Sequence, residues 1–83
     1  MDEQTATRIA EAAVESVGGT RKVYRNPRYA FSMEPSRTVE VEGHAAEIRW
    51  GEVSSPAVVT VAGYVFEIHD EGIDLLIRPS SRA

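Results

Sequence analysis

The sequence predicts an α+β domain in which one N-terminal helix packs on a four- to six-stranded, mainly antiparallel sheet. Two observations carry this prediction. Apolar residues recur at helical spacing near the N-terminus, and apolar and polar residues alternate along several later segments. With 83 residues and no cysteine, the chain is expected to form one domain over residues 1–83 without disulfides. These patterns define an architecture and carry little information about chemistry.

The helix is predicted from Glu3 to Val17, and Gly18-Gly19 predicts its end, because glycine accepts the left-handed conformation that follows a last turn. A stripe of mostly small residues would let this helix lie close to a sheet. A helix that binds a membrane surface would carry large apolar residues and a basic polar face, which this one lacks. The residues of the stripe are Ala6, Ile9, Ala10, Ala13, Val14 and Val17.

The next segment, residues 20–25, is interpreted as a first strand. Asn26-Pro27 then fits either a turn or the start of a short helix. In the first case residues 27–34 are extended, with Tyr29, Phe31 and Met33 alternating along a strand. In the second case the same residues form a short helix that ends before Pro35. The extended form is the prediction.

A hairpin is predicted from residues 37–42 and 45–50, with Gly43-His44 as a type II′ turn. This register pairs Val41 with Ala46 and Val39 with Ile48 on the inward face. It also pairs Glu40 with Glu47 on the outward face. Residues 51–56 form a polar connection to the next strand.

The C-terminal third, residues 57–79, is predicted as one long strand, a turn and a second strand. Gly63 is interpreted as a bulge or bend within the long strand. The turn is residues 69–72, with Gly72 at a position that needs a positive φ. This register pairs large apolar residues on one face, namely Ile68 with Ile73, Phe66 with Leu75, and Tyr64 with Ile77.

The charge is unevenly distributed. Residues 21–28 contain four basic residues and no acid, and the rest of the chain contains five basic and thirteen acidic residues, a net of −8. The longest apolar run is too short to span a bilayer, and the acidic N-terminus does not resemble a signal peptide. A cytoplasmic protein with no membrane contact is therefore expected.

The first candidate site is acidic. Glu40 and Glu47, with Glu42 nearby, are expected to form a carboxylate ridge on the outward face of the sheet. Like charges that face each other across a sheet are mildly destabilising, although well-hydrated carboxylates tolerate this position. The functional interpretation is a surface that meets a basic protein.

The second candidate is the basic segment of residues 21–29, in which four cations interleave with two tyrosines. Cations neutralise phosphates and tyrosine rings stack on unpaired bases, so this segment fits a nucleic acid or another anionic ligand. The simpler interpretation is an exposed segment whose cations balance acidic neighbours. The candidate residues are Arg21, Lys22, Tyr24, Arg25, Arg28 and Tyr29.

The two histidines form the third candidate. A simple meander would place His44 and His69 at the same end of the sheet, about 10 Å apart, with carboxylates nearby. Their spacing matches no metal-binding motif, and no cofactor motif is present. We therefore expect no metal and no cofactor, and a small enzyme with a His/carboxylate site ranks last among the functions considered.

Together these features predict a non-enzymatic protein–protein interaction module with a basic partner. Its size and charge suit a regulatory, adaptor or small inhibitor protein, including inhibitors encoded by phages or mobile elements. The alternative is binding of nucleic acid or an anionic ligand through residues 21–29. The sequence leaves the identity of the partner and the oligomeric state open.

Overall fold

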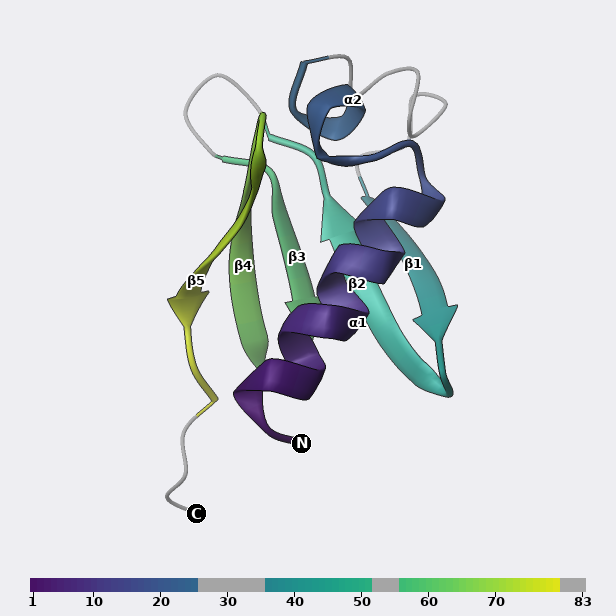
Figure 1. Cartoon of the computed structure of the whole chain (residues 1–83), viewed down its shortest axis with the longest axis vertical. Helices are drawn as coiled ribbons and strands as arrows, with labels where there is room; N and C mark the ends of the chain where they lie inside the picture. The colour runs from purple at the N-terminus through teal and green to yellow at the C-terminus, as the bar shows by residue number, and fades with distance from the viewer. Residues whose placement is uncertain (26–35, 52–55, 80–83) are drawn as a thin grey trace.

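The computed structural model describes residues 1–25, 36–51 and 56–79. It shows an N-terminal helix lying across one face of a five-stranded antiparallel sheet, which confirms the predicted α+β class (Figure 1). The elements are α1 (Glu3–Ser16), α2 (Thr20–Arg25), β1 (Ser36–Val41), β2 (His44–Arg49), β3 (Val58–Val61), β4 (Tyr64–His69) and β5 (Gly72–Ile77). We call the face covered by α1 the inner face and the opposite one the open face.

Helix α1 forms where its apolar stripe predicts it. Asp2 caps its N-terminus by accepting a 2.8 Å hydrogen bond from the backbone N–H of Thr5. Hydrogen bonding to Thr5 lowers the pKa of the Asp2 carboxyl below its ordinary value. At the other end, Gly18 and Gly19 both have positive φ, and the N–H of Gly19 donates to the carbonyl of Val14. The double glycine therefore ends the helix as predicted.

The prediction of a strand over residues 20–25 is wrong, because these residues form the short helix α2. The carbonyl of Gly19 accepts a 3.1 Å hydrogen bond from the N–H of Val23, so the chain re-enters a helix directly after the turn. Val23 is 1% exposed and joins the same core as α1. The packing of this one apolar side chain in the core thus favours the helical conformation of a segment that is too short to show helical periodicity in its sequence. The two interpretations of residues 27–34 lie outside the described residues.

The sheet is a meander in which each strand pairs with its sequence neighbours, in the order β1-β2-β3-β4-β5. The predicted long strand is wrong, because residues 58–69 form a hairpin that turns at Ala62-Gly63. Both turn residues have positive φ, 49° and 88°, as in a type I′ turn. A Cβ at Gly63 would lie 2.8 Å from the Cβ of Pro79, so glycine is also needed for space.

The hairpin of β4 and β5 has the predicted register at its turn end. Ile68 lies opposite Ile73 and Phe66 lies opposite Leu75. A bulge follows, so that Ile77 pairs with Val65, and the predicted pairing of Ile77 with Tyr64 is wrong. The turn itself is only two residues long, because His69 already pairs with Gly72, and Gly72 does not adopt the positive φ that was expected.

The hairpin of β1 and β2 turns at Glu42-Gly43, one residue earlier than predicted. Both residues have positive φ, 52° and 81°, so this is also a type I′ turn. The pairing therefore shifts by two residues, and Val39 lies opposite Ala46. A shift of two keeps every side chain on its predicted face.

The core lies between α1, α2 and the inner face of the sheet. Helix α1 contacts strands β1 to β4, and α2 contacts β4 and β5 at one end of the sheet (Figure 1). The buried residues of this single cluster are Ala6, Ile9, Ala10, Ala13, Val14, Val23, Ala46, Ile48, Ala57, Val59, Val61, Phe66 and Ile68.

Candidate functional site

The open face of the sheet is a surface that the described helices leave uncovered. Burial alternates along β3 and β4, with Val59, Val61, Phe66 and Ile68 buried and their neighbours half-buried. Both described helices contribute to the core on the inner side, so the outward side chains of the strands are left without a covering layer among the described residues. These side chains are Ser36, Thr38, Glu40, Ala45, Glu47, Arg49, Val58, Thr60, Val65, Glu67, His69, Asp74 and Ile77.

Two of the three predicted ridge residues lie on this face. Glu40 is opposite Ala45 and Glu47 is opposite Thr38, so the predicted direct pairing of the two glutamates is wrong. The earlier turn is the cause, and it makes the two glutamates diagonal neighbours, whose backbone positions are about 7–8 Å apart in standard strand geometry. This arrangement lowers their repulsion and keeps both on one exposed surface.

Glu42 has a different environment. It lies in the turn between β1 and β2 and forms an ion pair with Arg8 of α1. Both side chains are more than half exposed, so the pair contributes little to stability. The pair instead links the turn between β1 and β2 to helix α1. Glu42 is therefore engaged within the molecule, whereas Glu40 and Glu47 point outward from the sheet.

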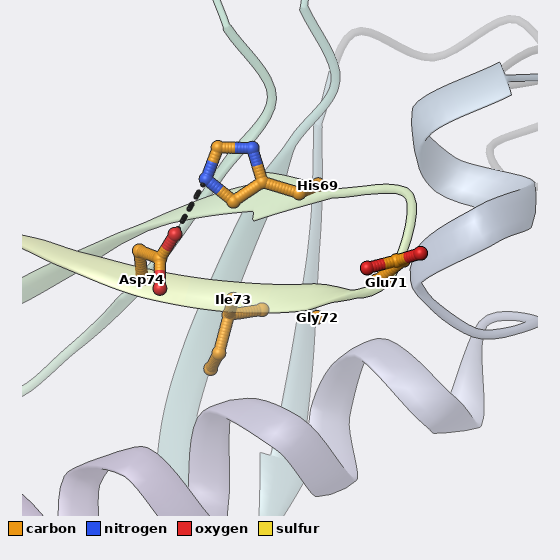
Figure 2. A pocket seen from close by; sticks show the side chains of 5 residues that line it. All are labelled: His69, Glu71, Gly72, Ile73 and Asp74. Carbon is orange, nitrogen blue, oxygen red and sulfur yellow. Dashed lines mark ion pairs between the residues drawn. The ribbon is translucent and has the colours of Figure 1, made fainter.

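A second group of charges on the open face joins β4 to β5. Glu67 lies opposite Asp74, and His69 is two residues further along β4, which puts all three on one side. The Nε2 atom of His69 is 3.1 Å from Glu67 Oε1 and 2.9 Å from Asp74 Oδ2. Figure 2 shows His69 and Asp74 facing each other across the hairpin. The imidazole thus lies between two carboxylates that would otherwise face each other unshielded.

The position of these three charged side chains on one face could have been predicted from the sequence. The register that pairs Ile68 with Ile73 also places Glu67 opposite Asp74, and it fixes His69 on the same side. An acidic pair on the second hairpin therefore follows from the predicted register, as the ridge does on the first. The acidic surface extends over more of the sheet than Glu40 and Glu47 alone indicate.

An open hollow of about 400 Å³ borders this group and is lined by His69, Glu71, Gly72, Ile73 and Asp74. Figure 2 shows that its lining side chains lie on both sides of the hairpin, with Ile73 directed toward the helices and His69 on the other side. Its polar groups therefore do not converge on one point, as a reacting substrate would require. The hollow contains no hydroxyl or amine side chain that could act as a nucleophile.

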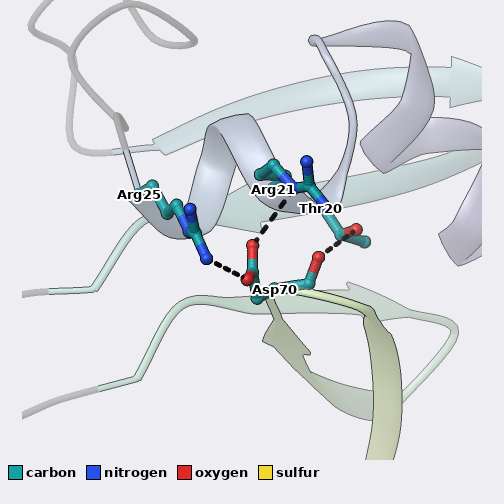
Figure 3. A network of polar contacts seen from close by, with 4 residues as sticks. All are labelled: Thr20, Arg21, Arg25 and Asp70. Carbon is teal, nitrogen blue, oxygen red and sulfur yellow. Dashed lines mark hydrogen bonds and ion pairs between the residues drawn. The ribbon is translucent and has the colours of Figure 1, made fainter.

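The basic segment is partly engaged within the molecule (Figure 3). Arg21 and Arg25, one turn apart on α2, both approach Asp70 in the turn between β4 and β5. Arg21 Nε is 3.5 Å from Asp70 Oδ1, and the hydroxyl of Thr20 donates to the Asp70 carbonyl at 3.4 Å. Asp70 was not predicted as a partner, because the segment was interpreted as a strand.

The other candidate residues of the basic segment differ in position. Lys22 and Tyr24 are exposed on α2, and the Tyr24 side chain is one of the large apolar groups that remain in solvent. Arg28 and Tyr29 lie outside the described residues. Within the described part, two of the three cations share one carboxylate, as the simpler interpretation of this segment expects.

The expectation that the two histidines lie at the same end of the sheet is wrong. His44 follows the turn between β1 and β2, and His69 precedes the turn between β4 and β5. The extra hairpin at Ala62-Gly63 reverses the chain once more, so these two turns are at opposite ends. Among residues 1–25, 36–51 and 56–79, no three His, Asp or Glu side chains are arranged to hold a metal ion.

Neither described helix is long and apolar enough to cross a membrane. Comparison of the chain with protein-family models, curated proteins and solved structures finds no match.

Proposed function

We propose that this chain is a non-enzymatic interaction module that binds a basic protein surface through the open face of its sheet. One observation carries the proposal. The outward side chains of the described strands include four carboxylates and one guanidinium, on a surface that the described helices do not cover. The carboxylates belong to Glu40, Glu47, Glu67 and Asp74, and the guanidinium belongs to Arg49.

Charge complementarity of this kind acts mainly on the rate of association and on the choice of partner. The whole chain has a net charge of −4, so its long-range field also attracts a basic partner. The same field repels a polyanion. Because Arg21 and Arg25 already face Asp70, the segment at residues 21–29 is the less favourable of the two surfaces for an external ligand.

The test compares two variants that change the net charge equally. Glu40→Lys with Glu47→Lys reverses the open face, and Glu11→Lys with Glu15→Lys reverses two exposed residues on α1. The partner is first captured with the wild-type protein and purified, and association is then followed by stopped flow or surface plasmon resonance at low salt. We expect the open-face variant to associate about tenfold more slowly than the α1 variant.

Three results would refute the proposal. The first is a captured partner that is acidic. The second is equal slowing in both variants, which would mean that net charge alone matters. The third is an unaffected open-face variant together with loss of binding in Lys22→Glu with Arg25→Glu. That third result would instead favour recognition of nucleic acid or another anion through the basic segment.

A further inference from the structure

We infer that the partner segment seated on the open face is an amphipathic α-helix, with an apolar stripe flanked on both sides by lysine or arginine. This inference rests on the proposed function and specifies the partner. It starts from the distribution of side chains on the open face. Val58 and Thr60 of β3 and Val65 of β4 are half-buried, and Ile77 of β5 lies beside Val65 on the same face and is 57% exposed. One acidic pair lies on the β1–β2 side of β3 and the other on the β4–β5 side.

Each strand next to β3 carries one acid beside this centre: Glu47 lies opposite Thr60, and Glu67 lies opposite Val58, whose other neighbour is Arg49. Glu47 is on β2, and Glu67 is on β4, with β3 between them. The strands β2 and β4 are two spacings apart, about 10 Å, and the two glutamates are also offset by two residues along the strands. That width matches an α-helix, whose diameter with side chains is about 10–12 Å. A helix running along β3 would place its apolar stripe on Val58, Thr60 and Val65, and long basic side chains could reach the acids on each side.

The backbone of the sheet favours a helix over an extended peptide. Strands β2, β3 and β4 are each paired on both sides, so their main-chain groups are already used. A partner on this face receives no hydrogen bonds from the backbone of the sheet. Its own backbone N–H and C=O groups must therefore pair with one another, as they do in a helix but not in a single extended strand. The six-residue strands β2 and β4 span roughly 20 Å, which corresponds to about 13 helical residues.

A second copy of this chain is a poor occupant of the face. Two open faces in contact would place Glu40, Glu47, Glu67 and Asp74 of one copy against the same acids of the other. Repulsion between like charges in a contact that excludes water opposes such a dimer. The charge therefore points to a different protein with a basic helix. With α1 on the inner face, the complex would have a helix on each side of the sheet.

The experiment uses designed 14-residue peptides as probes. One set places leucine at positions i, i+3, i+4 and i+7, with lysine on both flanks and alanine elsewhere. The control set has the same composition in an order without an apolar stripe. Binding to the full chain is measured by fluorescence anisotropy. We expect the amphipathic set to bind at least about tenfold more tightly than the control set.

A matched pair of variants separates the apolar centre from charge alone. Thr38 and Thr60 lie in the same cross-strand row, one on the edge strand β1 and one on the central strand β3. Thr60→Glu and Thr38→Glu each add one negative charge to the open face. We expect Thr60→Glu to weaken binding of the amphipathic peptides about tenfold, and Thr38→Glu to leave it unchanged or tighter. Val65→Thr, a nearly isosteric change, provides a second variant of the apolar centre in case Thr60→Glu fails to fold.

Equal binding of both peptide sets, or tighter binding in both threonine variants, would overturn the helix inference and leave recognition of a basic partner intact. Failure of every amphipathic peptide to bind would also overturn it. The proposed function fails separately, by the charge-reversal test with the captured partner. The two failures are therefore distinguishable.

Discussion

Replacement of Phe66 by alanine should remove a large part of the stability of this domain. Phe66 is 1% exposed and lies on β4 between Val59 of β3 and Leu75 of β5. Its ring also stacks on Tyr64, with centroids 6.4 Å apart and an interplanar angle of 20°. Phe→Ala at a fully buried site costs about 3–5 kcal/mol, from lost transfer free energy and from the cavity left behind.

That loss is large for a chain of this size. Domains are stable by roughly 0.05–0.15 kcal/mol per residue, which for 83 residues is about 4–12 kcal/mol. The variant should therefore lose at least about a quarter of its free energy of unfolding, with a fall in Tm of at least about 12 °C. Urea titration followed by far-UV circular dichroism gives the midpoint and the slope, and thus separates lost stability from lost cooperativity.

Two further variants make the result interpretable. Leu76→Ala changes a side chain that is 51% exposed on β5 and should cost no more than about 1 kcal/mol. Phe66→Leu leaves a smaller cavity and should lose about 1–2 kcal/mol if Phe66→Ala does not fold. An unchanged midpoint for Phe66→Ala, or an equal loss for Leu76→Ala, would mean that the inner face has been assigned to the wrong side chains.

Three other predictions follow from particular contacts. Gly63→Ala should lower the free energy of unfolding by about 1–3 kcal/mol, because a Cβ at φ +88° would also meet Pro79; an unchanged Tm would contradict this. Asp70→Asn should cost only about 0.5–1 kcal/mol, because its two guanidinium partners are 59% and 75% exposed, and it should speed amide exchange in α2 without affecting α1. Equimolar zinc should leave Tm unchanged, because His44 and His69 are at opposite ends of the sheet; a rise that His44→Ala abolishes would refute this.

The sequence predicted the elements whose pattern is long or unambiguous. Helix α1 could be predicted because its stripe repeats over four turns and ends at Gly18-Gly19. The register of β4 and β5 next to their turn could be predicted because a one-residue slip would turn Ile68 and Ile73 to opposite faces, whereas the bulge beyond Phe66 has no signal in the sequence. The outward position of Glu40 and Glu47 was predicted correctly although the turn was assigned wrongly, because the register of β1 and β2 shifted by two residues and each side chain kept its face.

Short-range turn chemistry explains the errors. Type I′ turns need positive φ at both central residues, and the dipeptides Asn-Gly and Asp-Gly are the sequence signals that usually indicate such a turn. Here the pairs are Glu42-Gly43 and Ala62-Gly63, in which the first residue carries no such signal. Because the turn at Ala62-Gly63 was not predicted, strands β3 and β4 were interpreted as one strand. His44 and His69 were therefore expected at the same end of the sheet.

The candidate site was only partly predictable for a related reason. Its acidic residues were visible in the sequence, but their surroundings depend on contacts between distant segments. The pairing of Arg25 with Asp70 joins residues 45 positions apart, and no local pattern indicates it. The apolar centre of the open face also depends on β3 and β4 being separate neighbouring strands.

The meander has a consequence for how quickly this chain can fold. Every strand pairs only with its neighbours in sequence, and three of the four pairings close through two-residue turns. Short loops cost little entropy to close, and hairpins form within about 1–10 μs. The β2–β3 pairing closes a longer connection, and the docking of α1 and α2 must wait for distant parts of the chain to meet. The sheet can therefore grow from two units that form independently, the β1–β2 hairpin and the β3–β4–β5 meander. We expect the slower step to be the one that brings the helices across their joined inner face.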